Sequence, residues 1–106
     1  MPYIKKDNRT VLDRYINHLS EAISDKHTNE DIMNIMGDLN YSITRLCASV
    51  ISENITYSKI GMITGVLENV KLELYRRIAV PYEENKVVEN GDVEEFTKID
   101  FWKHTT

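Results

Sequence analysis

Apolar residues recur along most of the chain at alternating spacings of four and three, a pattern typical of amphipathic helices. The first such stretch predicts a helix over about residues 8–24, with Asp7 or Asn8 available as its N-cap. Its apolar face consists of Leu12, Ile16, Leu19 and Ile23. A polar connection follows, in which Thr28 or Asn29 can cap the next helix and Glu30 and Asp31 favour its first turn.

The longest apolar seam predicts a second helix over about residues 30–52, and it comprises Ile32, Met36, Leu39, Ile43, Leu46 and Val50. A third helix is predicted over about residues 59–79, with Ser58 as its N-cap and Pro81 as its end. Its seam comprises Ile60, Ile63, Leu67, Val70, Leu74 and Ile78. Near-heptad spacing in both seams predicts an antiparallel hairpin within a three-helix, oligomeric bundle, in which the first helix either completes the layer or exchanges with a neighbouring subunit.

The predicted organisation is therefore an all-α helical domain over residues 1–81 and an acidic, mostly irregular C-terminal arm over residues 82–106. Asn90-Gly91 is a turn signal, so a short β-hairpin between Val87-Val88 and Val93 is one option for the arm. Docking on a partner subunit is the other. Apolar anchors are available for it in Phe96, Ile99, Phe101 and Trp102.

At 106 residues the chain is short enough for self-association to contribute substantially to its stability, so a homo-oligomer is expected. No apolar run approaches the ~20 residues of a membrane helix. The N-terminus has no apolar segment after its basic residues, which favours a cytoplasmic location. The single cysteine, Cys47, lies in an apolar helical pattern and is expected to be an inert, buried thiol.

Charge is unevenly distributed along the sequence. Residues 1–81 hold ten acids and ten bases, whereas residues 82–106 hold seven acids and three lysines, so the net charge of −4 belongs to the arm. Binding of duplex nucleic acid is disfavoured, because nonspecific affinity for it comes mainly from Lys and Arg on phosphates. A few local bases can still hold a small anion, and the acidic arm can dock on a protein partner.

Polar side chains crowd one flank of the second predicted helix. Asn40 and Thr44 lie one turn apart beside the seam, and Tyr41 and Arg45 form the next row. One interpretation is structural, with the first pair satisfying nearby backbone and the second stacking at a subunit contact. The other is a recognition surface, in which Arg45 binds phosphate and Tyr41 stacks on a base or ribose.

The third predicted helix carries a parallel polar row of Thr64, Glu68, Lys71 and Tyr75. Glu68 can pair with Lys71, and Glu73 with Arg76 or Arg77, as ordinary surface ion pairs. Gly61 and Gly65 lie one turn apart and allow another helix to approach closely, in which case the ion pairs are partly desolvated.

Catalytic patterns are sparse, and the chain is predicted to be no enzyme and to need no cofactor. His18, His27 and His104 lack the spacings of a helical metal site. An all-α nucleotide pyrophosphohydrolase is the enzyme alternative, but it needs carboxylates clustered on facing helices. The available acids lack that paired spacing, namely Glu30, Asp31, Asp38, Glu68 and Glu73.

Several runs make the sequence resemble a family of short, functionally uncharacterised proteins of bacteria and phages. They are Gly37-Asp38-Leu39-Asn40-Tyr41, Ile43-Thr44-Arg45-Leu46, Gly65-Val66-Leu67-Glu68, Tyr75-Arg76-Arg77 and Glu89-Asn90-Gly91-Asp92-Val93. The resemblance covers about residues 1–93. It implies no activity, although the phage connection suggests comparison with small helical phage proteins that sequester nucleotide messengers in pockets between subunits.

The leading hypothesis is a non-catalytic helical oligomer that sequesters a small anionic, nucleotide-type ligand. Arg45 and Lys71 would contact phosphate, Tyr41 and Tyr75 would stack, and Asn40 with Glu68 would recognise polar edges. The alternative is a structural or adaptor protein without a small-molecule ligand. The two differ in whether Arg45 and Lys71 face an open cavity or are neutralised by their own carboxylates.

Overall fold

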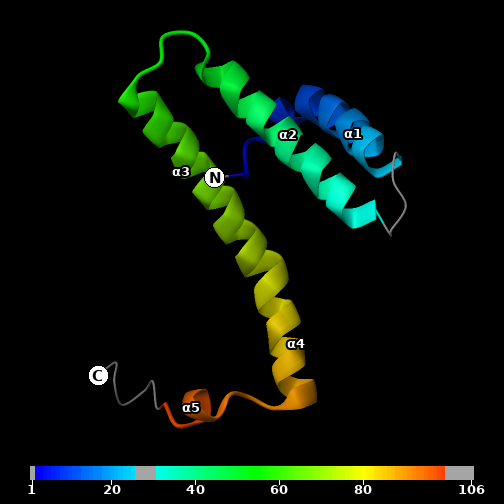
Figure 1. Ribbon diagram of the computed structural model, residues 1–106, viewed down its shortest axis with the longest axis vertical. Helices are drawn as coiled ribbons and strands as arrows, with labels where there is room; N and C mark the ends of the chain where they lie inside the picture. Colours follow the sequence, from blue (N-terminus) through cyan, green and yellow to red (C-terminus); the bar gives the residue numbers. More distant parts are fainter. Residues whose placement is uncertain (1, 26–30, 100–106) are drawn as a thin grey trace. The chain divides into compact units, whose positions relative to one another are not determined.

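The computed structural model describes residues 2–25 and 31–99, and all regular structure within these ranges is helical (Figure 1). The predicted all-α class is therefore confirmed, and these ranges contain no strand. The chain divides into two units, residues 1–67 and 68–106. The boundary falls inside helix α3, Tyr57–Leu74.

The first unit begins with a 3₁₀ turn, η1, at Lys6–Asn8, which leads into α1, Arg9–Asp25. Helix α2 spans Ile32–Ile51. The predicted first and second helices are thus confirmed, each to within about two residues at its ends. The predicted caps Thr28 and Asn29 lie outside the described residues.

Helix α3 starts two residues earlier than the cap prediction implies. The Lys59 backbone N–H donates to the Thr56 hydroxyl oxygen at 3.1 Å, so Thr56 is the N-cap and Ser58 is helical. The prediction of Ser58 was wrong because Ser58 and Thr56 are equally suitable by residue type. The backbone before the helix decides between them, and Asn54 turns it there with a φ of 55°.

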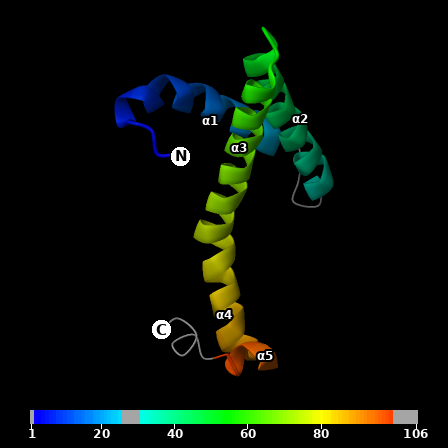
Figure 2. The same ribbon diagram turned by 90° about the vertical axis from the view of Figure 1, so that its left-hand side faces the viewer.

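Pro81 does not end the third helix, and this prediction was wrong. After α3 the backbone widens into a single π turn, η3, at Tyr75–Ala79, and continues as α4, Val80–Asn90. The Val80 N–H donates to the Tyr75 carbonyl, five residues back. A π turn re-pairs the backbone just before the proline, whose missing N–H is then tolerated in the first turn of α4. Figures 1 and 2 both show the ribbon passing from α3 into α4 without a gap.

The arm is accordingly less irregular than predicted, because residues 82–90 belong to α4 and Glu94–Thr97 form a short helix, α5. The proposed β-hairpin is also wrong. Gly91 ends α4 instead, with φ 86° and ψ 157°, and its N–H donates to the Val87 carbonyl at 2.8 Å. This backbone conformation is essentially restricted to glycine.

No residue in the described ranges is buried. The α2 seam remains open in a single copy, with exposed fractions of 42% for Leu39, 38% for Ile43 and 74% for Val50. Ile16 of α1 is 59% exposed. None of the described helices combines the length and apolar character needed to cross a membrane. The apolar faces found by periodicity are real, and their described side chains remain exposed or half-buried.

Replacing Gly91 with alanine is expected to destabilise the end of α4. A side chain at this φ and ψ costs about 1–3 kcal/mol of strain, so the last turn of α4 should fray and far-ultraviolet helicity should fall. Asn90→Ala is the matched control, because it changes a helical neighbour. Equal helicity and unfolding free energy in G91A and N90A would contradict the assigned backbone.

Candidate functional site

The Arg45 guanidinium lies over the ring of Tyr41, with its carbon 5.9 Å from the ring centroid. The two residues are one turn apart on α2, so helix geometry alone brings them together. Tyr41 is 63% exposed. A cation over an exposed aromatic ring contributes about 0.5–1 kcal/mol, which is enough to orient the guanidinium without neutralising it.

Arg45 and Lys71 differ in whether a carboxylate neutralises them. No carboxylate in the described ranges forms an ion pair with Arg45. Lys71 lies in the second unit, where its Nζ is 3.6 Å from Oε1 of Glu68. That pair is mostly exposed, so it adds little stability. It nevertheless gives Lys71 a local counter-charge, and Arg45 remains the cation with unused hydrogen-bonding capacity.

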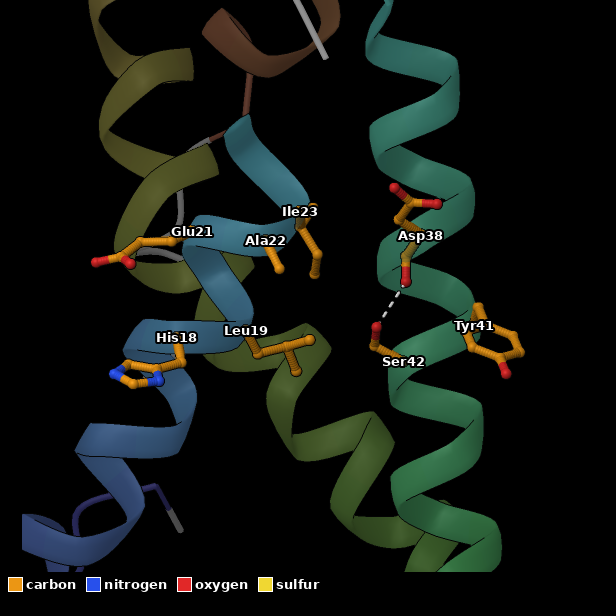
Figure 3. A pocket seen from close by; sticks show the side chains of 8 residues that line it. All are labelled: His18, Leu19, Glu21, Ala22, Ile23, Asp38, Tyr41 and Ser42. Atoms are coloured by element: carbon orange, nitrogen blue, oxygen red, sulfur yellow. Dashed lines mark hydrogen bonds between the residues drawn. The ribbon is translucent and has the colours of Figure 1, made fainter. Parts of the chain in front are cut away.

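Two adjoining clefts lie between α1 and α2. The larger has a volume of about 640 Å³ and is lined by His18, Leu19, Glu21, Ala22, Ile23, Asp38, Tyr41 and Ser42. In Figure 3, Leu19, Ala22 and Ile23 point toward α2, whereas His18 and Glu21 point away from it. The Ser42 hydroxyl donates to the Asp38 carbonyl at 2.8 Å, so the hydrogen-bond donor of Ser42 is already used within α2.

The smaller cleft contains Arg45. Its volume is about 300 Å³, and it is lined by Leu19, Tyr41, Ser42, Arg45, Leu46 and Ser49. Its lining combines apolar side chains, three hydroxyls and one cation, in keeping with small-molecule sites, which begin at about this volume. Leu19, Tyr41 and Ser42 line both clefts, so α1 and α2 each contribute to the wall that the two clefts share.

Tyr41 also lines a hollow of about 580 Å³ whose described walls all come from α2, namely Met33, Met36, Gly37, Asn40, Tyr41 and Thr44. The Thr44 hydroxyl donates to Asn40 Oδ1 at 3.4 Å there. Gly37 lines the hollow with its backbone alone. A Cβ at that position would meet nothing within 4 Å, so the space beside it is open. Residues from one helix make only one side of a binding site. The four predicted α2 residues thus lie together on an open surface.

Most predicted polar residues of the third helix belong to the second unit, whereas Thr64 belongs to the first. Glu68 pairs with Lys71, and Arg76 forms an ion pair with Glu73. Tyr75 is the first residue of the π turn and is 61% exposed. Within the second unit these residues therefore form a row of local pairs.

Gly61 and Gly65 lie on the part of α3 in the first unit. A Cβ built on either glycine would meet nothing within 4 Å. No described element of the first unit therefore packs closely against them. Close helix packing at this position remains a prediction about another copy.

Sequence reasoning missed the walls that α1 adds to the site. Leu19 had been assigned only to the apolar face, and Ser42 and Ser49 had no role. The available signal was the spacing of the two serines, two turns apart on the α2 flank that faces α1. Which helix covers that flank cannot be read from the spacing.

Within residues 2–25 and 31–99, no three His, Cys, Asp or Glu side chains gather as a possible metal cluster. The arrangement is that of an all-helical protein with an arginine–tyrosine surface beside an open cleft. Residues 1–93 match the family model described as Domain of unknown function (DUF6899), and the chain belongs to that family. The resemblance to an uncharacterised family is thereby confirmed. No curated protein and no solved structure matches the chain.

Replacing Gly61 and Gly65 together with alanine tests whether another helix uses the glycine face. If the face is open, each alanine should stabilise α3 by about 0.5–1 kcal/mol, measured by chemical denaturation. The single variants show whether the two effects add. If the double variant dissociates in light scattering at a concentration where the unchanged chain stays associated, a helix of another copy lies against these glycines.

Proposed function

We propose that this protein is a non-catalytic, self-associating helical binding protein that holds a small anionic ligand of nucleotide type at Arg45 and Tyr41. The observation that carries the proposal is the Arg45 guanidinium, stacked on Tyr41 beside a 300 Å³ cleft and without a carboxylate partner in the described ranges.

The chemistry of the surface suits a phosphate attached to a planar group. Guanidinium offers a fork of parallel donors to phosphate oxygens, and these charge-assisted bonds are stronger than neutral ones. The Tyr41 face not covered by Arg45 can stack on a base or a ribose. Asn40 presents an amide one position away, where it can recognise a polar edge of the ligand.

Self-association is supported by the exposure of every helix. A three-helix unit normally buries a large share of its apolar side chains, and this one buries none of those described. Copies of the chain can cover these faces by closing α2 and α3 into a hairpin bundle. Ligand sites would then lie at subunit contacts, as in small phage proteins that sequester nucleotides, with the cytoplasm as the working location.

A second candidate is a structural or adaptor protein without a small-molecule ligand. It is favoured by the Lys71–Glu68 pair, which leaves one of the two expected phosphate contacts already occupied by a carboxylate. Exposed apolar side chains in the acidic arm, Phe96 at 62% and Ile99 at 43%, suit docking on a protein partner.

Titration calorimetry against a panel of cyclic and linear nucleotides tests the ligand. We expect at least one nucleotide to bind, and Arg45→Gln to weaken it about tenfold or more, since a hydrogen bond to a charged group contributes about 1.5–3 kcal/mol. Lys71→Gln is the matched control and should change affinity little. Absence of heat and of thermal shift across the panel would leave the adaptor alternative.

Light scattering across a dilution series tests self-association separately from ligand binding. The full chain should have at least twice the monomer mass at high concentration and lose helicity as it dissociates, because the uncovered helices are marginal alone. A mass of 12.4 kDa at all concentrations, with unchanged helicity, would exclude the oligomer.

A further inference from the structure

Gly37, Tyr41 and Arg45 form one row along α2, because each lies one turn from the next. The Arg45 guanidinium lies over one face of the Tyr41 ring, with its carbon 5.9 Å from the ring centroid. Gly37 is one turn away in the opposite direction and has no side chain to cover the second face. A Cβ built on Gly37 would meet nothing within 4 Å. The second face of the ring is therefore open.

The space beside that face is the hollow of about 580 Å³ in which Gly37 and Tyr41 lie. Met33 and Met36 also line it, and both are exposed. Their thioethers are polarisable and make favourable contacts with aromatic rings. In Figure 3 none of the labelled α1 side chains lies over the Tyr41 ring. The hollow thus offers a flat ring one aromatic face and two adaptable side chains.

Gly37 is unfavourable for the helix that contains it, since glycine loses more backbone entropy in a helix than alanine. Its backbone is helical and its φ is not positive, so its conformation suits any residue. No atom of the described chain requires the space that its side chain would fill. What a side chain at this position would remove is access to the second face of Tyr41.

The Thr44 hydroxyl determines which end of the Asn40 amide is available to a ligand. It donates to Asn40 Oδ1 at 3.4 Å, so the carbonyl end of the amide is engaged within α2. The Nδ2 amino group is a donor only, and it forms no hydrogen bond within the described residues. A ligand edge made of acceptors therefore suits Asn40 better than an edge that also donates.

Guanine and adenine differ at the edge that carries N7. Guanine presents two acceptors there, N7 and O6, whereas adenine presents the N7 acceptor and the N6 amino donor. Asparagine recognises adenine with both ends of its amide, which here would require the Oδ1 that Thr44 engages. The acceptor edge of guanine needs Nδ2 alone.

We infer that the ligand carries a 6-oxopurine base of the guanine type, stacked on the second face of Tyr41 over Gly37. The N7 and O6 edge of the base lies at Asn40 Nδ2, and the phosphate of the same ligand binds Arg45. The inference rests on the proposed function and names the ligand class of that site. Tyr41 is then the middle of the site, with the guanidinium on one face and the base on the other.

Titration calorimetry on the full chain with matched nucleotides tests the base. Guanosine, inosine, 7-deazaguanosine and adenosine are compared as 5′-monophosphates and as 3′,5′-cyclic monophosphates, so that within each series the base alone varies. Inosine keeps both acceptors of the edge, whereas 7-deazaguanosine lacks N7. We expect the guanosine and inosine forms to bind alike and about tenfold more tightly than the other two.

The outcomes separate this inference from the proposed function. Adenosine forms that bind as tightly as guanosine forms overturn the guanine-type base and leave a nucleotide site at Arg45 standing. The same holds if other nucleotides bind but no 6-oxopurine does. If no nucleotide of any kind binds, the proposed function fails and the inference fails with it.

Thr44→Val tests the orientation of the Asn40 amide. Valine has the same shape without the hydroxyl, so Oδ1 is released and the amide can pair with adenine. The guanine preference should fall from about tenfold toward equality. Thr64→Val is the matched control, because the Thr64 hydroxyl also donates within its own helix, to the Ile60 and Gly61 carbonyls at 3.0 and 3.1 Å. An undiminished preference in T44V overturns the role of the amide.

Gly37→Leu tests the stacking face. Leucine one turn from Tyr41 should cover the ring, so thermal stability should rise while guanine affinity falls about tenfold or more, as on loss of base stacking. Gly37→Ala is the matched control, because it removes the glycine penalty but adds only a methyl group. Full affinity in G37L, or an equal loss in both variants, overturns stacking at this face.

Discussion

The structure depends on one requirement, the covering of apolar helix faces, none of whose described side chains is buried. No described residue is buried, although each of the three longer helices of the sequence pattern carries a continuous apolar seam. Isolated helices of this length are marginal in water, and most helical stability in proteins comes from packing. The organisation of this protein therefore follows from which surfaces cover the apolar seams.

The same requirement connects the fold to the candidate site. Tyr41 and Arg45 lie on the side of α2 away from the middle of the seam, so covering the seam leaves them accessible. Arg45 lacks a carboxylate partner among the residues that the structure describes, whereas Lys71 has one in Glu68. Of the two cations expected to bind phosphate, Arg45 alone keeps its full charge for a ligand. The candidate site therefore includes fewer residues than the two predicted polar rows.

Local patterns predicted the helices well where one interaction dominates. The periodicity in α1 and α2 set their ends to within about two residues, because amphipathic spacing is a property of neighbouring turns. The predictions were wrong where one residue is compatible with two backbone conformations. Pro81 is compatible with a helix end or with a π turn that re-pairs the backbone, and Gly91 marks a helix end as well as a hairpin turn. The helical spacing of Tyr82 and Lys86, whose ammonium lies 5.5 Å from the ring, was the available sign that α4 continues.

By itself the sequence determined the all-helical class, the apolar seams, the family and the short-range pairs such as Arg45 with Tyr41 and Lys71 with Glu68. All of these depend on residues within about one or two turns of each other, or on the order of residues along the chain. Only the tertiary structure decided that α1 lies against Ser42 and Arg45 and that none of the seam residues of α2 is buried. These outcomes depend on contacts between residues far apart in the chain, and helical periodicity, which places a residue on a face, says nothing about what will cover that face.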